Sequence, residues 1–149
     1  MKFISGLFVL ALLVSGCSSE DGNNIPTAPS ANVAFSTTDL RVGTGAEATV
    51  GRAANVNYTL WLYSTTAADN KGRQIQTGNF SFTVGTGVIP GFSQGVQGMR
   101  VGGLRRVIIP PNLGYGSAGQ PPDIPGNATL IFEIELVAVQ QQYEVVSST

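Results

Sequence analysis

The chain has 149 residues, a formal net charge of −1 and a charged-residue content of only 11%. It is long enough for one compact domain with its own core, and it lacks the basic run that nucleic-acid binding requires. The chain contains no histidine and a single cysteine, which excludes Ser-His-Asp and Cys-His catalysis, an internal disulfide and any His-based or multi-Cys metal site. We therefore expect neither a cofactor nor a metal.

Residues 1–16 are expected to form a secretion signal. Lys2 supplies the positive start, and the apolar run that follows is too short to span a bilayer comfortably as a permanent helix. The stretch LVSGC at residues 13–17 resembles the lipobox of bacterial lipoproteins. This resemblance implies that Cys17 becomes the lipidated first residue of the mature protein and anchors it to a membrane. The alternative is an ordinary secretory signal with a chance cysteine.

Residues 17–32 are expected to form the lipidated cysteine and a flexible tether. The sequence SSEDGNNIPTAPSAN after the cysteine is polar, rich in small residues and interrupted by proline, so it cannot bury enough apolar surface to order itself. The globular domain is then predicted over residues 33–142, with a C-terminal tail over residues 143–149.

Within the predicted domain, apolar and polar residues mostly alternate. A period of two, together with 19 glycines and 8 prolines, is typical of half-buried strands in an antiparallel sheet joined by many turns. The residues expected on the inward face are Val56, Tyr58, Leu60, Leu62, Phe80, Phe82, Val84, Val107, Ile109, Leu130, Phe132, Ile134 and Leu136. Ile131 is expected on the opposite face, and Arg105 and Arg106 at a solvated strand edge.

One short helix is predicted over about residues 92–99, where Phe92, Val96 and Met99 recur at helical spacing. Glycines in and beside this segment weaken its intrinsic helix propensity, so packing must hold it. Gly102-Gly103 are expected to end it. The predicted fold class is therefore α+β, with a curved antiparallel sheet packed around one short helix.

Seven short blocks occur in an order that matches a known family. They are VNYT at 56–59, FSFTVG at 80–85, VIPGF at 88–92, GVQGM at 95–99, RRVIIP at 105–110, LGYG at 113–116 and IPGNATLIF at 124–132. Over about residues 50–139 the chain resembles the FKBP-type peptidyl-prolyl cis/trans isomerases. The resemblance implies a five- or six-stranded sheet wrapped around the helix, and an isomerase whose active site is an apolar bowl between them.

The resemblance also implies a set of site residues, carried across motif by motif. The pocket residues are Tyr58, Phe82, Val88, Ile89, Phe92, Tyr115, Ile124 and Phe132, with Ile75, Gln76 and Phe80 as weaker substrate-binding candidates. Ile75-Gln76 stands where the family usually has Phe-Asp, Phe92 where it often has Trp, and Asp123-Ile124 where an apolar pair is expected. We expect these departures to lower catalytic power and macrolide binding without changing the fold.

The function predicted from these features is isomerisation of X-Pro bonds in exported proteins, which assists their folding. The expected partners are proline-containing segments or unfolded exported proteins, a membrane through Cys17, and macrolides as a further ligand class. The expected location is the cell envelope, on the periplasmic face of the outer membrane if the cell is Gram-negative. Two alternatives stay open: a module that binds proline segments with little or no turnover, and a structural surface lipoprotein with an unoccupied pocket.

Overall fold

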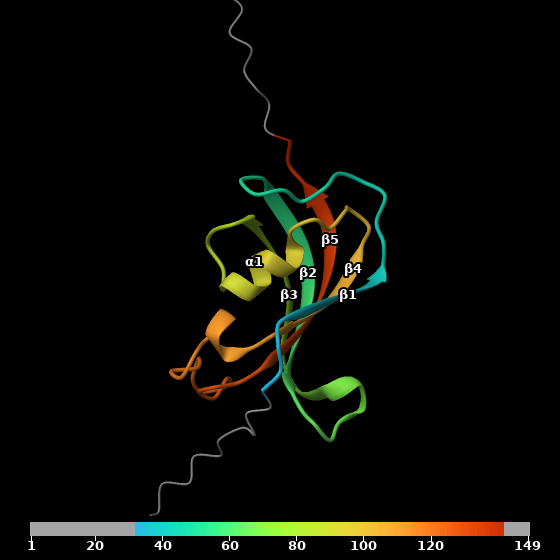
Figure 1. Cartoon of the computed structure of the whole chain (residues 1–149). Helices are drawn as coiled ribbons and strands as arrows, with labels where there is room; N and C mark the ends of the chain where they lie inside the picture. The colour runs from blue at the N-terminus through green and yellow to red at the C-terminus, as the bar shows by residue number, and fades with distance from the viewer. Residues whose placement is uncertain (1–31, 142–149) are drawn as a thin grey trace, which may run out of the picture.

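The computed structural model describes residues 32–141, which fold as a five-stranded antiparallel sheet and one α-helix (Figure 1). The elements are β1 (Ser36–Arg41), β2 (Ala53–Tyr63), the 3-10 turn η1 (Ala68–Asn70), β3 (Lys71–Thr83), α1 (Pro90–Val96), β4 (Leu104–Ile109), the 3-10 turn η2 (Pro111–Leu113) and β5 (Leu130–Val139). No helix in this part of the chain is long and apolar enough to cross a membrane. The predicted signal segment, Cys17, nearly all of the tether and the tail lie outside the described residues.

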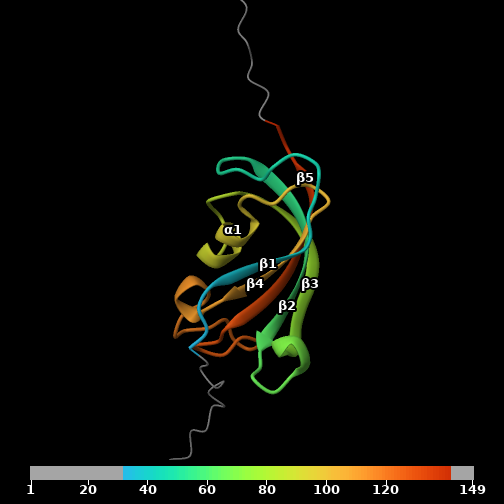
Figure 2. The same ribbon diagram turned by 45° about the vertical axis from the view of Figure 1, so that its right-hand side comes forward.

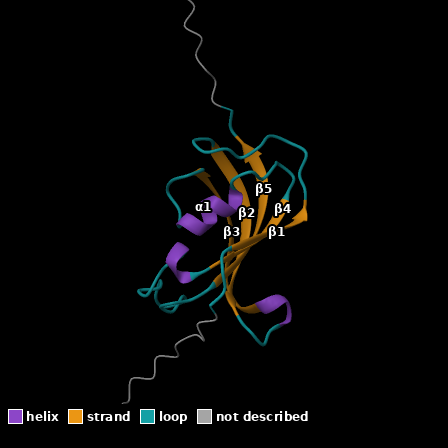
Figure 3. Cartoon of the chain, viewed as in Figure 1, coloured by secondary structure: helices purple, strands orange, loops and turns teal. Residues whose placement is uncertain are grey.

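The sheet has the strand order β1-β4-β5-β2-β3, and every neighbouring pair is antiparallel. Figure 2 shows the sheet bent around α1, which lies on its concave side. Figure 3 shows that the loop before α1 and the long loop after η2 lie on the same side as the helix, whereas the connection between β2 and β3 lies away from it. The predicted α+β architecture, with a curved sheet around one short helix, is confirmed.

The core lies between the concave face of the sheet and α1. All of the residues predicted to face inward belong to this core or pack against it, and removing them from water is the main favourable term in folding. Ile131, predicted on the opposite face, is also fully buried. Its cross-strand partners are Trp61 on β2 and Ile108 on β4, so the outer face carries a small apolar patch among its polar residues.

The helix begins and ends earlier than predicted, and Gly102-Gly103 do not end it. Pro90 occupies the start of α1, a position where the missing N–H costs no hydrogen bond. The last helical residue is Val96, and Gly98 just beyond it has a φ of 82°, a left-handed conformation that stops a helix and favours glycine.

Two glycines bring α1 directly onto β4. A Cβ atom on Gly95 would lie 2.7 Å from a methyl group of Val107, and one on Gly91 would collide with Ile109. The glycines that weaken the helix as an isolated segment therefore permit the close contact that holds it in the fold.

Arg105 and Arg106 do not lie at a sheet edge, because β4 is between β1 and β5. The Arg105 guanidinium donates to the carbonyls of Gly95 and Gln97 at 3.0 and 3.2 Å, at the C-terminal end of α1. It also donates to both carboxylate oxygens of Asp39 on β1, at 2.6 and 3.2 Å. Arg105 thus joins the end of the helix to the edge strand, while Arg106 forms ion pairs on the outer face.

Candidate active site

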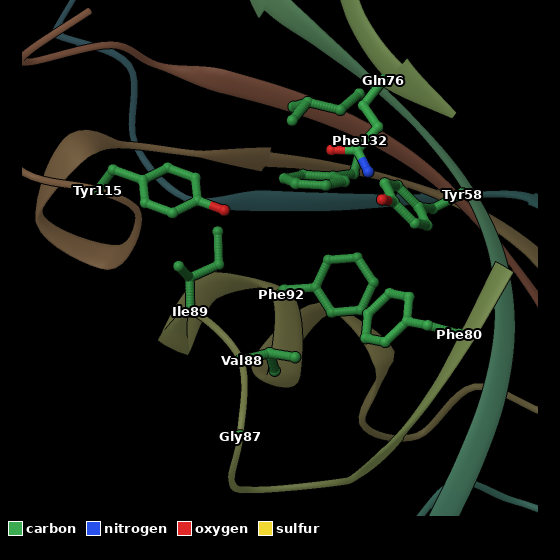
Figure 4. Close-up of a pocket in the computed structure, with 10 residues that line it drawn as sticks. Tyr58, Gln76, Phe80, Gly87, Val88, Ile89, Phe92, Tyr115 and Phe132 are labelled. Atoms are coloured by element: carbon green, nitrogen blue, oxygen red, sulfur yellow. The ribbon is translucent and has the colours of Figure 1, made fainter. Parts of the chain in front are cut away.

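A cavity of about 200 Å³ opens between α1 and the concave face of the sheet (Figure 4). Strands β2, β3 and β5, the segment that leads into α1 and the loop after η2 all contribute to it. Its lining residues are Tyr58, Leu60, Gln76, Phe80, Gly87, Val88, Ile89, Phe92, Tyr115 and Phe132. Six of the ten have purely apolar aromatic or aliphatic side chains, of residue types that are commonly buried away from water. Two tyrosines and one glutamine supply the polar side-chain atoms.

Phe92, near the start of α1, is the centre of the aromatic wall. Its ring centroid lies 5.0 Å from that of Phe132, 5.5 Å from those of Phe80 and Phe82, and 6.2 Å from that of Tyr58. Three of these four pairs meet edge to face, an arrangement favoured by the charge distribution of aromatic rings. The rings support one another, so the cavity wall is formed before a ligand arrives.

Gln76 shares a face of β3 with Phe80, and a β-bulge next to it turns Ile75 towards the same side of the sheet. Leu60 pairs with Gln76 but the next residue, Trp61, pairs with Gln74, so Ile75 is an extra residue opposite β2. A bulge of this kind redirects side chains and is common beside active sites. Gln76 lines the cavity, whereas Ile75 packs against the core.

Three hydrogen-bond donors on residues that line the cavity have no partner among the described residues. Neither the Tyr58 nor the Tyr115 hydroxyl bonds another of the described residues, and the same holds for the Ile89 backbone N–H. Burial raises the pKa of the Tyr58 hydroxyl. Burial, and secondarily the nearby Tyr58, raise the pKa of the Tyr115 hydroxyl. Both groups are therefore protonated at neutral pH and can donate to a carbonyl oxygen.

The flanking glycines help to present Tyr115. Gly116 has a φ of 60°, which turns the chain sharply after the ring. Figure 4 shows the Tyr115 hydroxyl directed into the cavity, across from Tyr58. The loop continues to Gly119, whose N–H donates to the Tyr115 carbonyl at 3.1 Å.

The structure brings most of the predicted site residues together. Those that line the cavity are Tyr58, Val88, Ile89, Phe92, Tyr115, Phe132 and, from the weaker group, Gln76 and Phe80. Phe82 lies behind this lining, with its ring centroid 5.5 Å from those of Phe80 and Phe92, and supports the wall from the core. Ile124 is buried and faces a neighbouring groove.

Two lining residues, Leu60 and Gly87, were not predicted to belong to the site. Leu60 follows Tyr58 by two positions on the same strand face, so the alternating pattern that identifies Tyr58 carries a signal for Leu60 as well. Gly87 contributes only backbone to the cavity, and no property of its side chain could have revealed it.

Comparison with known proteins places this geometry in a family. Residues 45–137 match the FKBP-type peptidyl-prolyl cis-trans isomerase family. The chain is 42% identical over 104 residues to an FK506-binding protein of Neisseria meningitidis serogroup A, a match that covers 69% of this chain and 94% of that protein. It is 44% identical over 95 residues to the human peptidyl-prolyl cis-trans isomerase FKBP2, covering 63% of this chain and 66% of that protein.

Solved structures agree with the sequence relatives. A peptidyl-prolyl cis-trans isomerase from Pseudomonas syringae matches with a TM-score of 0.61 and 30% identity, over 72% of this chain and 76% of that one. FkpA from Escherichia coli matches with a TM-score of 0.61 and 31% identity, over 74% of this chain and 50% of that one. The chain therefore belongs to the FKBP-type peptidyl-prolyl cis-trans isomerases.

Proposed function

We propose that the aromatic cavity is the place where this isomerase rotates the X-Pro bond, and that its substrates are exported proteins at the cell envelope. One observation carries the first part: side chains from three strands, the start of α1 and the loop after η2 converge on a single cavity of about 200 Å³. That cavity combines an apolar wall with unpartnered donors, which is the combination that amide rotation requires.

The reaction makes and breaks no covalent bond. Rotation about an X-Pro amide crosses a barrier of roughly 18–20 kcal/mol, because resonance gives the C–N bond partial double-bond character. At the twisted transition state this resonance is lost and the amide is less polar than when planar. Water stabilises the planar form more than the twisted form, so a site that excludes water removes part of the barrier.

The lining residues have two roles in this mechanism: some bind the proline ring and others bind the substrate carbonyls. The proline ring packs on the face made by Phe92, Phe132 and Tyr58, which fixes one side of the rotating bond. The Tyr115 hydroxyl and the Ile89 N–H donate to substrate carbonyls and hold the other side. Donors that are aimed before the substrate arrives fix the direction of twist at little cost in reorganisation.

The envelope location is supported by the sequence alone. Cys17 follows an apolar run and a small residue, and it is the only cysteine in the chain. Several acyl chains on one residue would anchor the protein stably, where a single chain gives only marginal binding. Replacing Cys17 by Ser in the producing cell should release the protein from the membrane fraction. Retention of C17S in that fraction would argue against lipidation.

FK506-type macrolides are a second ligand class for the same cavity. The Neisseria relative is named an FK506-binding protein, which supports macrolide binding here. Gln76 in the cavity lining is an amide where the family usually has Asp. Asp123 in the adjoining loop is a carboxylate where an apolar residue is expected, and both changes weaken the fit. We expect FK506 to compete with a proline peptide, at higher concentration than in relatives that retain the Phe-Asp pair.

The experiment that tests catalysis is exchange NMR on an Ala-Leu-Pro-Phe peptide with the purified full chain. An isomerase accelerates cis/trans exchange of the peptide, whereas a module that only binds shifts the two populations without accelerating exchange. Ile89→Ala, which removes part of the cavity wall, should slow exchange by about 3- to 10-fold. Val137→Ala, a similar truncation at an exposed position of β5, should leave the rate unchanged.

A further inference from the structure

A second and larger hollow lies beside the aromatic cavity. It has a volume of about 720 Å³ and runs between the loop after η2 and the ends of β2 and β3. We call it the loop groove. It is lined by Leu62, Arg73, Ser117, Ala118, Pro121, Pro122, Asp123, Ile124, Pro125 and Gly126. The reaction described above uses none of these residues.

The loop groove continues the aromatic cavity along one wall. Leu60 lines the cavity and Leu62 lines the groove. Both face the concave side, because β2 pairs with β5 in regular register there, Leu60 with Phe132 and Leu62 with Leu130. Two residues along a strand span about 6.6 Å, so the groove begins about two residues of extended chain from the cavity.

The opposite wall shows the same continuity. Tyr115 lines the cavity, and Ser117 and Ala118 line the groove. A polypeptide whose proline occupied the cavity would therefore have its neighbouring residues between these two walls, without a change in chain direction.

The groove is preformed by contacts within and across the loop. Gln120 and Ile124 exchange backbone hydrogen bonds of 2.8 and 2.9 Å, which close the turn that carries Pro121 and Pro122. Arg73 of β3 donates to the Asp123 carbonyl at 2.6 Å, and its guanidinium lies 3.7 Å from the Asp123 carboxylate. These bonds fix the loop relative to the strand, so a ligand would not have to order it.

The chemistry of the groove favours an apolar occupant. Its floor consists of the buried Ile124 and the half-buried Leu62, and exposed Pro121 and Pro122 border it. The two charged members, Arg73 and Asp123, pair with each other at the rim. A charged side chain in the groove would lose hydration without gaining a free counter-ion, whereas an apolar side chain would be removed from water.

We infer that the loop groove is a specificity subsite, which binds an apolar side chain two to three residues from the X-Pro bond of an unfolded substrate. This inference rests on the proposed function of the aromatic cavity, because the position of the proline fixes which substrate residue reaches the groove. The isomerase thus prefers prolines that lie two to three residues from an apolar side chain. Such side chains are accessible in proteins that have not yet folded.

The test compares matched peptides with the full chain. Each peptide has an Ala-Leu-Pro-Phe centre and three added residues on one side, with either Leu or Ser at the first and second added positions, which lie two and three residues from the Leu-Pro pair. The measured quantity is the ratio of kcat/KM for the Leu peptide to that for the Ser peptide. Burial of one apolar side chain predicts a ratio of about 5 to 10 for extension on the side that reaches the groove.

Two variants locate the effect in the groove. Ala118→Glu places a charged side chain on the groove wall and should lower the ratio towards one. Ala138→Glu makes the same change at an exposed position near the far end of β5 and should leave the ratio as in the parent protein. A parent ratio near one on both sides, with the central peptide still isomerised, would overturn the subsite and leave the isomerase intact.

A binding measurement separates this result from a failure of the proposed function. If no peptide is isomerised, the Ile124 methyl resonances are followed during titration with the Leu and Ser peptides. Shifts with the Leu peptide alone would support the groove even without turnover. No shift, or equal shifts with both peptides, would overturn it.

Discussion

Strands β2 and β5 present two different surfaces from one backbone. On the concave face, Tyr58 and Phe132 meet with ring centroids 6.0 Å apart in the wall of the cavity. On the convex face, Asn57, which precedes Tyr58 in the chain, donates to the Glu135 carboxylate at 3.1 Å. The difference shows how the fold supports a reaction driven by exclusion of water: the charged side chains are on the convex face and the cluster of aromatic rings is on the concave face.

The convex face satisfies its charges locally. Glu133 accepts from Lys71 at 2.5 Å and from Arg106 at 3.0 Å, and its side chain is only 19% exposed. Burial raises the pKa of this carboxyl, but hydrogen bonds from Lys71 and Arg106 outweigh it and the net pKa is lowered. Glu135 is held in the same way by Asn57 and Arg41, which lower its pKa.

The largest expected effect comes from removing one aromatic residue from each face and comparing the losses of stability. Phe92→Ala removes the ring that contacts four others in the cavity wall and should lower the free energy of unfolding by about 3–5 kcal/mol. Trp61 lies on the convex face, with the Lys71 ammonium 4.4 Å from its ring, and is only half-buried. Trp61→Ala should therefore lower the free energy of unfolding by less than about 2 kcal/mol. Urea unfolding measures both, and equal losses would show that the concave face is not the main source of stability.

The same contrast explains which features the sequence could predict. Alternation identified the inward residues of β2, β3, β4 and β5, because side chains of a strand point to opposite faces by backbone geometry alone. It could not say how far along the strand a residue lies from the cavity. Phe80 and Phe82 share a face, but Phe80 lines the cavity and Phe82 lies behind it.

Other features depend on contacts between distant segments. Nothing near Ile75 in the sequence indicates the bulge that separates it from Gln76, because the bulge exists only in the pairing with β2. Arg105 resembles a solvated residue in sequence, yet it joins Asp39 to the end of α1. Ile124 belongs to a loop, where no alternating pattern indicates the direction of a side chain. The family motif therefore predicted it in the pocket, but the conformation of the loop directs it into the neighbouring groove.

A second prediction removes one polar atom from the concave face. Tyr115→Phe deletes the hydroxyl that is directed into the cavity and should lower kcat/KM by about 10-fold, the worth of one hydrogen bond to the twisting amide. The free energy of unfolding should change by less than about 1 kcal/mol, since the hydroxyl bonds none of the described residues. Tyr63→Phe, the same change outside the cavity, is the control. A loss of stability with unchanged kcat/KM would assign Tyr115 a structural role instead.

A third prediction concerns the charges of the convex face. The folded pKa of Glu133 lies below its ordinary value of 4.5, so its contribution to stability is fully present above that value and is lost as pH falls through the folded pKa. Glu133→Gln should cost about 1 kcal/mol at neutral pH. It should also make stability less dependent on pH between about pH 5 and pH 3, while Asp39 and Glu135 retain their share. Thermal unfolding across that range, with activity at neutral pH as control, measures this. An acid profile identical to that of the parent protein would contradict the role of the Glu133 ion pairs.

The smallest expected effect comes from placing a charge on the concave face itself. Gln76→Asp replaces an amide, which can donate or accept and so permits several arrangements, by a carboxylate that only accepts. A charge-assisted hydrogen bond from the substrate backbone or from Tyr58 would then hold the substrate in fewer orientations, and kcat/KM should rise by about 2- to 4-fold. Gln74→Asp, the same change two residues away in β3 at a position opposite Trp61, should have no effect on the rate.

The result for Gln76 also decides how strictly the concave face excludes charge. If the rate rises, one ionised group at the cavity edge is compatible with a dry interior, because the exposed Gln76 lies beside the bulge in β3 and is not part of the aromatic wall. If the rate stays level or falls, the cost of keeping a carboxylate beside a water-poor cavity exceeds the gain in orientation. A neutral amide at Gln76, beside the aliphatic Ile75, would then suit this cavity better than a carboxylate.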